Sequence, residues 1–359
     1  MTETKKLRLK GINYDTGTNY MPGYLSREIW NVEVMHQEIR AIHDDLGCNT
    51  INIYGSEIDR VMDCARLSLE MGLDVWLQPR LIDSTPEEML AHLAELAAAA
   101  EPLRQQYPQR SIVLNIGCEL SIFMSGLIPG RTFLHRVRWL TYLWWLWMLI
   151  PRYNNRLNQH LQKAVRVARS VFKGDISYGS GIWERVDWAA FDMVGLNYYR
   201  EWSNQSTYAD ELRAFHRYDK PIVITEFGCC SFDGAARLGA SGDSIVDYTK
   251  PQPELRGLYQ RNEQVQADYI LDLLHIFQTE NIYGAFVFEF TEPSHPHFSD
   301  PRRDLDMASY GIVKVYGDEA GKPDSILRWE PKQAFHALAQ FYGARHPANS
   351  DASHARSAG

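Results

Sequence analysis

Two glutamates in the sequence each stand at the end of a strongly apolar stretch. Glu119 ends the run "SIVLNIGCE", and Glu226 lies within "PIVITEFG". A carboxylate at the end of a buried segment is costly unless it is paired, hydrated or used in chemistry. Two carboxyl groups facing one cleft could cleave a glycosidic bond, one giving a proton to the leaving oxygen while the other attacks the anomeric carbon. For either glutamate alone, a salt bridge at a strand end is the simpler interpretation.

The two glutamates can meet only if the chain brings their strands to one site. Eight strand-like runs alternate with stretches of helical periodicity, and no linker divides them. Runs that are apolar on both faces are typical of parallel strands covered by helices. The predicted strands span 7–15, 50–55, 74–80, 111–119, 175–181, 193–200, 221–229 and 283–290. This pattern predicts a single (β/α)8, or TIM, barrel in which Glu119 ends strand four and Glu226 ends strand seven.

Helical periodicity fills the intervals between these strands. The predicted helices span 28–46, 57–71, 86–106, 154–172, 204–217, 258–279 and 331–343. A doubly wound open sheet is the rival fold, but the segment "GINYDTGTNYMPG" lacks a glycine-rich phosphate loop after the first strand. The sequence therefore favours the barrel.

Three connections are longer than a barrel requires, and each follows the carboxyl end of a strand. They span 121–152, 229–257 and 291–330, after strands four, seven and eight. Barrel enzymes build their active face from such loops. The catalytic barrel is predicted over 1–343, and the polar segment 344–359 is predicted to be a disordered tail.

Composition and charge narrow the class of protein. A net charge of -8 argues against nucleic acid as a partner. The five cysteines are odd in number and lack metal-site spacing, and the beginning of the sequence shows no apolar signal segment of the usual length. These features predict a cytoplasmic protein without a metal. A pair of carboxyl groups can supply both proton transfer and covalent catalysis, so no cofactor is expected.

Strand-four and strand-seven glutamates on an eightfold barrel resemble the clan A glycoside hydrolases, over nearly the whole chain. "ITEFG" is similar to a common form of the nucleophile strand, and "DMVGLNYYR" at 192–200 is similar to the strand-six motif of family 1 β-glycosidases. The resemblance implies a retaining enzyme with Glu119 as acid/base and Glu226 as nucleophile. It also implies that Tyr199 hydrogen-bonds the nucleophile and that Asn197 binds substrate nearby. Strand parity likewise gives Tyr199 the same direction as Asn197.

The chain departs from the clan at three places. Cys118 stands where the clan usually has an asparagine that contacts the 2-hydroxyl of the sugar. Tyr54 stands where an arginine often ends strand two, and Phe288 with Glu289 replace a common strand-eight tryptophan. Losing a buried hydrogen-bond partner changes recognition, so these departures predict a different sugar, a furanose, an altered ring position or a degenerate enzyme.

Other side chains at the predicted strand ends are candidates for sugar contacts. These candidates are Asp15 with its neighbour Tyr14, Tyr54, Arg80 with Gln78, Trp183 and Glu289. Arg80 could instead pair with either catalytic glutamate or with an acidic sugar. Glu289 and Glu292 would compete with Glu226 if the strand register differed. His295 and His297 lack a clear third ligand, so no metal site is predicted there, and Cys229 with Cys230 is interpreted as packing.

The segment "WLTYLWWLWMLIP" at 139–151 follows the basic stretch "RVR". Its uncharged run is shorter than the roughly 20 residues needed to span a bilayer. A buried helix or a lid over the active site is favoured, whereas an oligomer contact and an interfacial membrane anchor are alternatives. The oligomeric state is not predicted.

The sequence as a whole predicts a retaining glycoside hydrolase or transglycosylase acting on an unidentified carbohydrate. Two alternatives are open. One is a barrel that binds carbohydrate without turnover, which Cys118 favours. The other is a barrel enzyme of a different reaction class, in which the glutamates act as proton-transfer bases.

Overall fold

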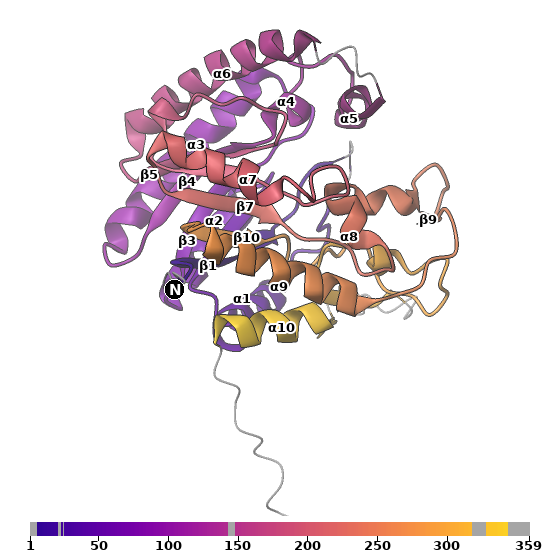
Figure 1. Cartoon of the computed structure of the whole chain (residues 1–359). Coiled ribbons are helices and arrows are strands. Elements are labelled where there is room, and N and C mark those ends of the chain that lie inside the picture. The colour runs from indigo at the N-terminus through magenta and orange to yellow at the C-terminus, as the bar shows by residue number, and fades with distance from the viewer. Residues whose placement is uncertain (1–5, 21–22, 24, 143–147, 318–327, 344–359) are drawn as a thin grey trace, which may run out of the picture.

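Eight parallel strands close into a barrel in the computed structural model, which describes residues 6–20, 23, 25–142, 148–317 and 328–343 (Figure 1). The strands pair in the order β1-β10-β7-β6-β5-β4-β3-β2. Their bounds are β1 Leu9–Asp15, β2 Thr50–Gly55, β3 Asp74–Pro79, β4 Ile112–Cys118, β5 Asp175–Ser180, β6 Val194–Asn197, β7 Ile222–Phe227 and β10 Gly284–Val287. The predicted (β/α)8 fold class is confirmed.

Helices surround this barrel, and smaller elements fill its long connections. The larger helices are α1 Val32–Arg40, α2 Ile58–Glu70, α3 Pro86–Gln106, α5 Phe133–Tyr142, α6 Ile150–Val171, α7 Tyr208–Arg213, α9 Glu263–Thr279 and α10 Gln333–Tyr342. Short helical turns are η1 Ala41–Asp45, α4 Leu120–Phe123, η3 Trp188–Ala190, η4 Ala214–Tyr218, α8 Ala235–Leu238, η5 Gly239–Ile245 and η6 Leu305–Ala308. Two small antiparallel pairs join β8 Val246–Asp247 to β9 Glu254–Leu255 and β11 Val313–Val315 to β12 Trp329–Pro331.

Several elements are shorter than predicted. The strand predicted at 193–200 ends at Asn197, because Tyr198 leaves the barrel and packs against Tyr208 with ring centroids 4.5 Å apart. The helix predicted at 204–217 begins only at Tyr208 and tightens into a 3-10 turn at Ala214. Helix α3 begins as its capping residues predict, since Thr85 and Glu88 form a reciprocal capping box.

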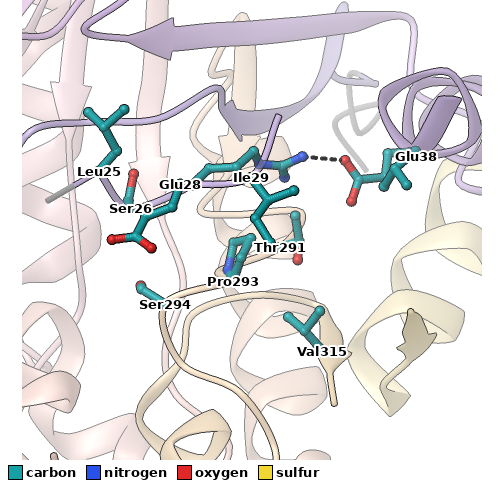
Figure 2. A pocket seen from close by; sticks show the side chains of 11 residues that line it. Leu25, Ser26, Glu28, Ile29, Glu38, Thr291, Pro293, Ser294 and Val315 are labelled. Atoms are coloured by element: carbon teal, nitrogen blue, oxygen red, sulfur yellow. Dashed lines mark hydrogen bonds and ion pairs between the residues drawn. The ribbon is translucent and has the colours of Figure 1, made fainter. Parts of the chain in front are cut away.

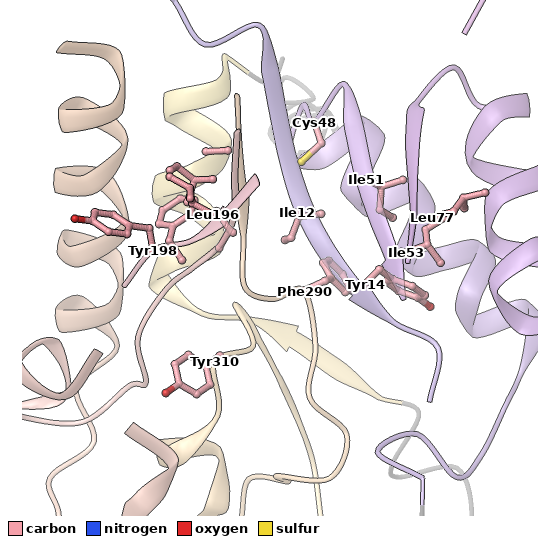
Figure 3. Packing of buried hydrophobic residues seen from close by; sticks show 14 of the residues in the cluster. Ile12, Tyr14, Cys48, Ile51, Ile53, Leu77, Leu196, Tyr198, Phe290 and Tyr310 are labelled. Atoms are coloured by element: carbon pink, nitrogen blue, oxygen red, sulfur yellow. The ribbon is translucent and has the colours of Figure 1, made fainter. Parts of the chain in front are cut away.

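The barrel interior is apolar near the amino ends of the strands and polar near their carboxyl ends. The apolar layer consists of Trp76, Val113, Met193, Val223 and Phe286. Above it lie the buried amides of Asn13, Asn52, Gln78 and Asn115, which hydrogen-bond to one another. The outer core packs the other strand faces against the helices, as Figure 3 shows for Ile51, Ile53 and Leu77. The interior near the carboxyl ends of the strands can therefore accommodate further polar side chains.

Irregular strand pairing breaks the alternation of side chains in β4 and β7. In β4, Asn115 pairs with Ser177, but Cys118 pairs with Gly179. One extra residue therefore lies in β4, which is the geometry of a β-bulge. Simple alternation of side chains along β4 is therefore interrupted between Asn115 and Cys118.

The same irregularity occurs in β7. Ile222 and Ile224 belong to the outer core, whereas Val223 lies in the apolar layer inside the barrel. The pairing with β6 shifts by one residue just before Glu226. Glu226 would share the direction of Ile222 and Ile224 by simple alternation, but the bulge turns it toward the barrel interior.

Two predicted features lie wholly or partly outside the described residues. The tail at 344–359 is one, and the centre of the tryptophan-rich segment, 143–147, is the other. Among the residues that the structure does describe, no helix is long and apolar enough to cross a membrane.

Candidate active site

Glu226 is held by a buried arginine from across the barrel. The Nη2 atom of Arg80 donates to Oε1 of Glu226 at 2.5 Å. Arg80 is 3 % exposed and Glu226 is 6 % exposed, so water screens this ion pair little. Of the roles that the sequence allows Arg80, the structure shows the pairing with Glu226. This contact places a cation directly against the carboxyl group of Glu226.

The end of β2 places a tyrosine next to Arg80. Tyr54, at the end of β2, lies flat beside this arginine, with its ring centroid 3.8 Å from Cζ of Arg80. The hydroxyl of Tyr54 donates to Oε2 of Glu289 at 2.6 Å. The residue at the strand-two position therefore supports Arg80 instead of contacting Glu226.

Glu119 follows β4 in a left-handed backbone conformation, with φ 42° and ψ 44°. A residue other than glycine adopts this conformation only when its surroundings impose it. Three consecutive amides are held here by β5 and the loop after it. The N–H of Glu119 donates to the carbonyl of Gly179 at 2.8 Å, that of Leu120 to the hydroxyl of Tyr178 at 2.8 Å, and that of Ser121 to Oε1 of Glu184 at 2.9 Å.

Tyr178 and Glu184 are site residues that sequence reasoning missed. They also contact each other, because the Tyr178 hydroxyl donates to Oε2 of Glu184 at 2.8 Å. The only sequence signal was a polar segment, "SYGSGIWE", at the end of a predicted strand. Their contacts fix the direction in which Glu119 enters the site.

The surroundings of Glu119 favour its protonated form. Burial, the neighbouring carboxylate of Glu226 and then that of Glu184 raise the pKa of Glu119 to about 8. A hydrogen bond from Asn197 and the more distant Arg80 act in the opposite direction. The two glutamates therefore differ as an acid and a nucleophile must, since one is kept neutral and the other is paired with a cation.

A short chain of contacts links the two carboxyl groups. The Nδ2 atom of Asn197 lies 3.2 Å from Oε1 of Glu119 and 3.1 Å from Sγ of Cys118. The Cys118 thiol in turn donates to Oε1 of Glu226 at 3.4 Å. Cys118 thus lies between the two glutamates.

The two tyrosines of the strand-six motif point to opposite sides. The Tyr199 hydroxyl lies 3.5 Å from Oε2 of Glu226, which is long for a hydrogen bond. The Tyr198 hydroxyl instead contacts Oε2 of Glu211 at 3.1 Å, on the helical side. Tyr199 is the member of the pair that reaches the candidate site.

The remaining predicted contacts have partners within the protein. Both carboxylate oxygens of Asp15 accept hydrogen bonds from its own loop, from the Gly17 amide and from the Thr18 and Ser26 hydroxyls. Trp183 donates through Nε1 to Oγ of Ser121 at 2.8 Å, so its ring lies beside the segment that carries Glu119. Burial raises the pKa of Glu289 well above its usual range, and the Glu292 and Asp15 charges add to this effect.

The two histidines in the strand-eight loop have separate partners. His295 pairs with Glu292 at 2.7 Å, and His297 pairs with Asp304 at 2.9 Å. Among the described residues, no group of three or more His, Cys, Asp or Glu side chains could hold a metal ion. Cys229 and Cys230 are buried with free thiols, in agreement with a packing role.

Two pockets lie away from the glutamates. A pocket of about 110 Å³ is lined by residues of the segment 25–29, of helix α1 and of the loop after β10, among them Ser26, Glu38 and Thr291 (Figure 2). A second, of about 340 Å³, lies between the loop at 126–130 and the start of α6. Neither is lined by Glu119 or Glu226.

No family model matches the chain, and no curated protein does. Among solved structures, the chain is similar to a complex of a GH113 β-1,4-mannanase, with 15 % identity and a TM-score of 0.60 over 94 % of this chain and 100 % of that chain. A GH113 β-mannanase from Alicyclobacillus acidocaldarius shares 14 % identity with a TM-score of 0.57, over 95 % of this chain and 99 % of that chain. A GH2 β-galacturonidase from Eisenbergiella tayi shares 17 % identity with a TM-score of 0.56, over 95 % of this chain and 52 % of that chain.

At these identities the likeness shows the fold. The predicted resemblance to clan A glycoside hydrolases is confirmed in their (β/α)8 barrel, over nearly the whole chain. The likeness does not test the strand-six motif or the roles of individual residues.

Proposed function

We propose that the protein is a retaining glycoside hydrolase that uses Glu226 as nucleophile and Glu119 as acid/base. In the first step, the carboxylate of Glu226 attacks the anomeric carbon while Glu119 gives its proton to the departing oxygen. In the second step, Glu119 takes a proton from water, or from a second sugar, which displaces Glu226. The partner is a carbohydrate, and no cofactor enters either step.

The observation that carries this proposal is the opposite electrostatic environment of two linked carboxyl groups. Arg80 pairs with Glu226, whereas burial and two neighbouring carboxylates raise the pKa of Glu119 to about 8. The likeness of the whole barrel to β-mannanases adds support, because a β-mannanase cleaves glycosidic bonds. Asn197 and Tyr199 are proposed to contact the sugar near Glu226, together with Tyr54, Arg80, Trp183, Asp15 and Glu289.

Covalent labelling tests the proposal directly. Incubation with a panel of 2-fluoro glycosides bearing good leaving groups should attach one sugar to Glu226, as identified by peptide mass spectrometry. Turnover of the matching aryl glycosides should be lost in parallel. Label on another carboxylate, such as Glu289, would contradict the assignment of Glu226.

A barrel that binds carbohydrate without turnover is the second candidate, and Cys118 favours it. The thiol contacts Glu226 at 3.4 Å and occupies the position of the usual sugar-binding amide. This candidate predicts that sugars bind by calorimetry and that no member of the fluoro-sugar panel labels the protein. A barrel enzyme of another reaction class would instead turn over a non-glycoside substrate without such labelling.

The pH dependence of activity should follow the proton on Glu119. Because Glu119 must be protonated to act as the acid, kcat/KM should fall as pH rises through about 8. Glu184→Gln removes a nearby negative charge, so the pKa of Glu119 should decrease and the alkaline limb should move down by about one pH unit. The pH profile of kcat/KM for an aryl glycoside measures this shift.

A purely structural effect of Glu184→Gln would lower the whole profile without moving its alkaline limb. Thermal unfolding of the variant provides the control for folding. An unmoved limb in a folded variant would contradict the electrostatic contribution of Glu184.

A further inference from the structure

The region after Glu119 has a charge composition unlike the rest of the chain. Residues 120–174 contain nine lysines and arginines and neither aspartate nor glutamate, whereas the whole chain has a net charge of -8. This region contains α4, α5 and α6 together with the loop between β4 and α5. A strongly basic segment in an acidic protein points to a partner with negative charge.

Most of these cations lie on the surface. Those exposed on α5, on α6 and in the loop before α5 are Arg131, Arg138, Arg152, Arg156, Lys163 and Arg166. In the part of the chain that the structure describes, none of these six forms an ion pair. On α6, Arg152, Arg156 and Lys163 follow one another at spacings of four and seven residues, so they share one helical face. This face of α6 therefore carries three cations that form no ion pair with the described residues.

Apolar side chains are exposed beside these cations. Leu134 on α5 is 50 % exposed, Met148 is 78 % exposed and Leu149 is 38 % exposed. The pocket of about 340 Å³ lies at the same place, lined by Leu149, Arg152 and Arg156 among others. Arginine interleaved with exposed leucine and methionine is typical of segments that lie in a membrane interface.

The position of α5 is fixed relative to the barrel. Arg136 is fully buried, and its guanidinium donates to the carbonyls of Ile122 and Gly130 at 2.5 and 3.0 Å. The same side chain forms an ion pair with Asp83, in the loop after β3. Figure 1 shows α5 at the outer edge of the molecule. Its exposed face is thus presented outward on a rigid support.

We propose that α5 and the first half of α6 form a docking surface for a bilayer containing anionic phospholipids. Arg131, Arg138, Arg152 and Arg156 lie against the lipid phosphates, while Leu134 and Met148 enter the headgroup region. A nucleic acid would neutralise the arginines but would leave the apolar side chains in water, so lipid is the better match. This proposal does not depend on the proposed catalytic function.

Vesicle co-sedimentation of the full chain tests the docking surface. Vesicles of phosphatidylcholine mixed equally with phosphatidylglycerol should bind the protein, and those of phosphatidylcholine alone should bind it much less. Added salt should weaken the binding, because it screens the arginines. Arg152→Gln with Arg156→Gln should lower the partition coefficient about thirtyfold, since each cation contributes about fivefold.

Matched variants separate the two components of the surface. Leu134→Ser with Met148→Ser should also weaken binding to anionic vesicles, whereas Leu258→Ser, at a position 87 % exposed elsewhere, should not. Arg66→Gln with Arg217→Gln is the charge control, because both residues are exposed outside this region. Circular dichroism establishes that every variant is folded.

Three outcomes would overturn the proposal. The first is equal binding, or no binding, to the two kinds of vesicle. The second is an equal loss of vesicle binding when the control residues Arg66 and Arg217 are replaced by glutamine. The third is binding to a duplex oligonucleotide in place of anionic vesicles.

Discussion

Glu226→Gln should reduce turnover of an aryl glycoside by about 10⁶-fold, the scale seen when a covalent nucleophile is removed from an enzyme. The amide keeps the size of the side chain but cannot attack the anomeric carbon. It also leaves Arg80 without its carboxylate, and breaking a buried ion pair costs about 3–5 kcal/mol of folding free energy. The free energy of unfolding, measured by urea denaturation, should therefore fall while the protein remains folded at room temperature.

Glu289→Gln is the matched control for this variant. Glu289 is also a buried carboxyl group near the carboxyl ends of the strands, where it accepts from Tyr54. It is proposed to contact substrate, so its variant should lose activity, but by far less. Azide should restore turnover to Glu226→Ala alone and give a glycosyl azide of inverted configuration, because the small anion replaces the missing carboxylate. A larger loss from Glu289→Gln than from Glu226→Gln would reverse the assignment.

Glu119→Gln should produce a loss that depends on the leaving group. Glycosides with poor leaving groups need the proton of Glu119, and general acid catalysis contributes about 10²–10⁴-fold. Aryl glycosides with acidic phenols need little protonation, so their first step should be almost unchanged. A plot of log kcat/KM against leaving-group pKa should therefore become much steeper in the variant.

The pH profile provides an independent check on Glu119. Its alkaline limb, expected near pH 8 in the native protein, should disappear in Glu119→Gln, because the titrating acid has been removed. Glu88→Gln is the control, because it makes the same change of side chain at an exposed capping residue. Asn115→Asp would not serve, because it adds a buried charge. A uniform loss for all leaving groups, with the alkaline limb preserved, would show that Glu119 is not the acid.

The sequence by itself determined the class of fold. Apolar runs of strand length, separated by segments with helical periodicity, are local features, and their alternation predicts a parallel barrel without any knowledge of contacts. The same reasoning places Glu119 and Glu226 at the carboxyl ends of strands four and seven. Residue type and strand number were sufficient to bring both glutamates to one end of the barrel.

The tertiary structure decided how the glutamates are surrounded. Arg80 and Glu226 are 146 residues apart in the chain, and no local pattern distinguishes this pairing from the other roles open to an arginine at a strand end. The bulges that turn Cys118 and Glu226 inward depend on how each strand pairs with its neighbours. The left-handed backbone of Glu119 likewise depends on acceptors supplied by β5 and its loop. These features arise from register and packing between strands, which hydrophobic periodicity along a single strand does not encode.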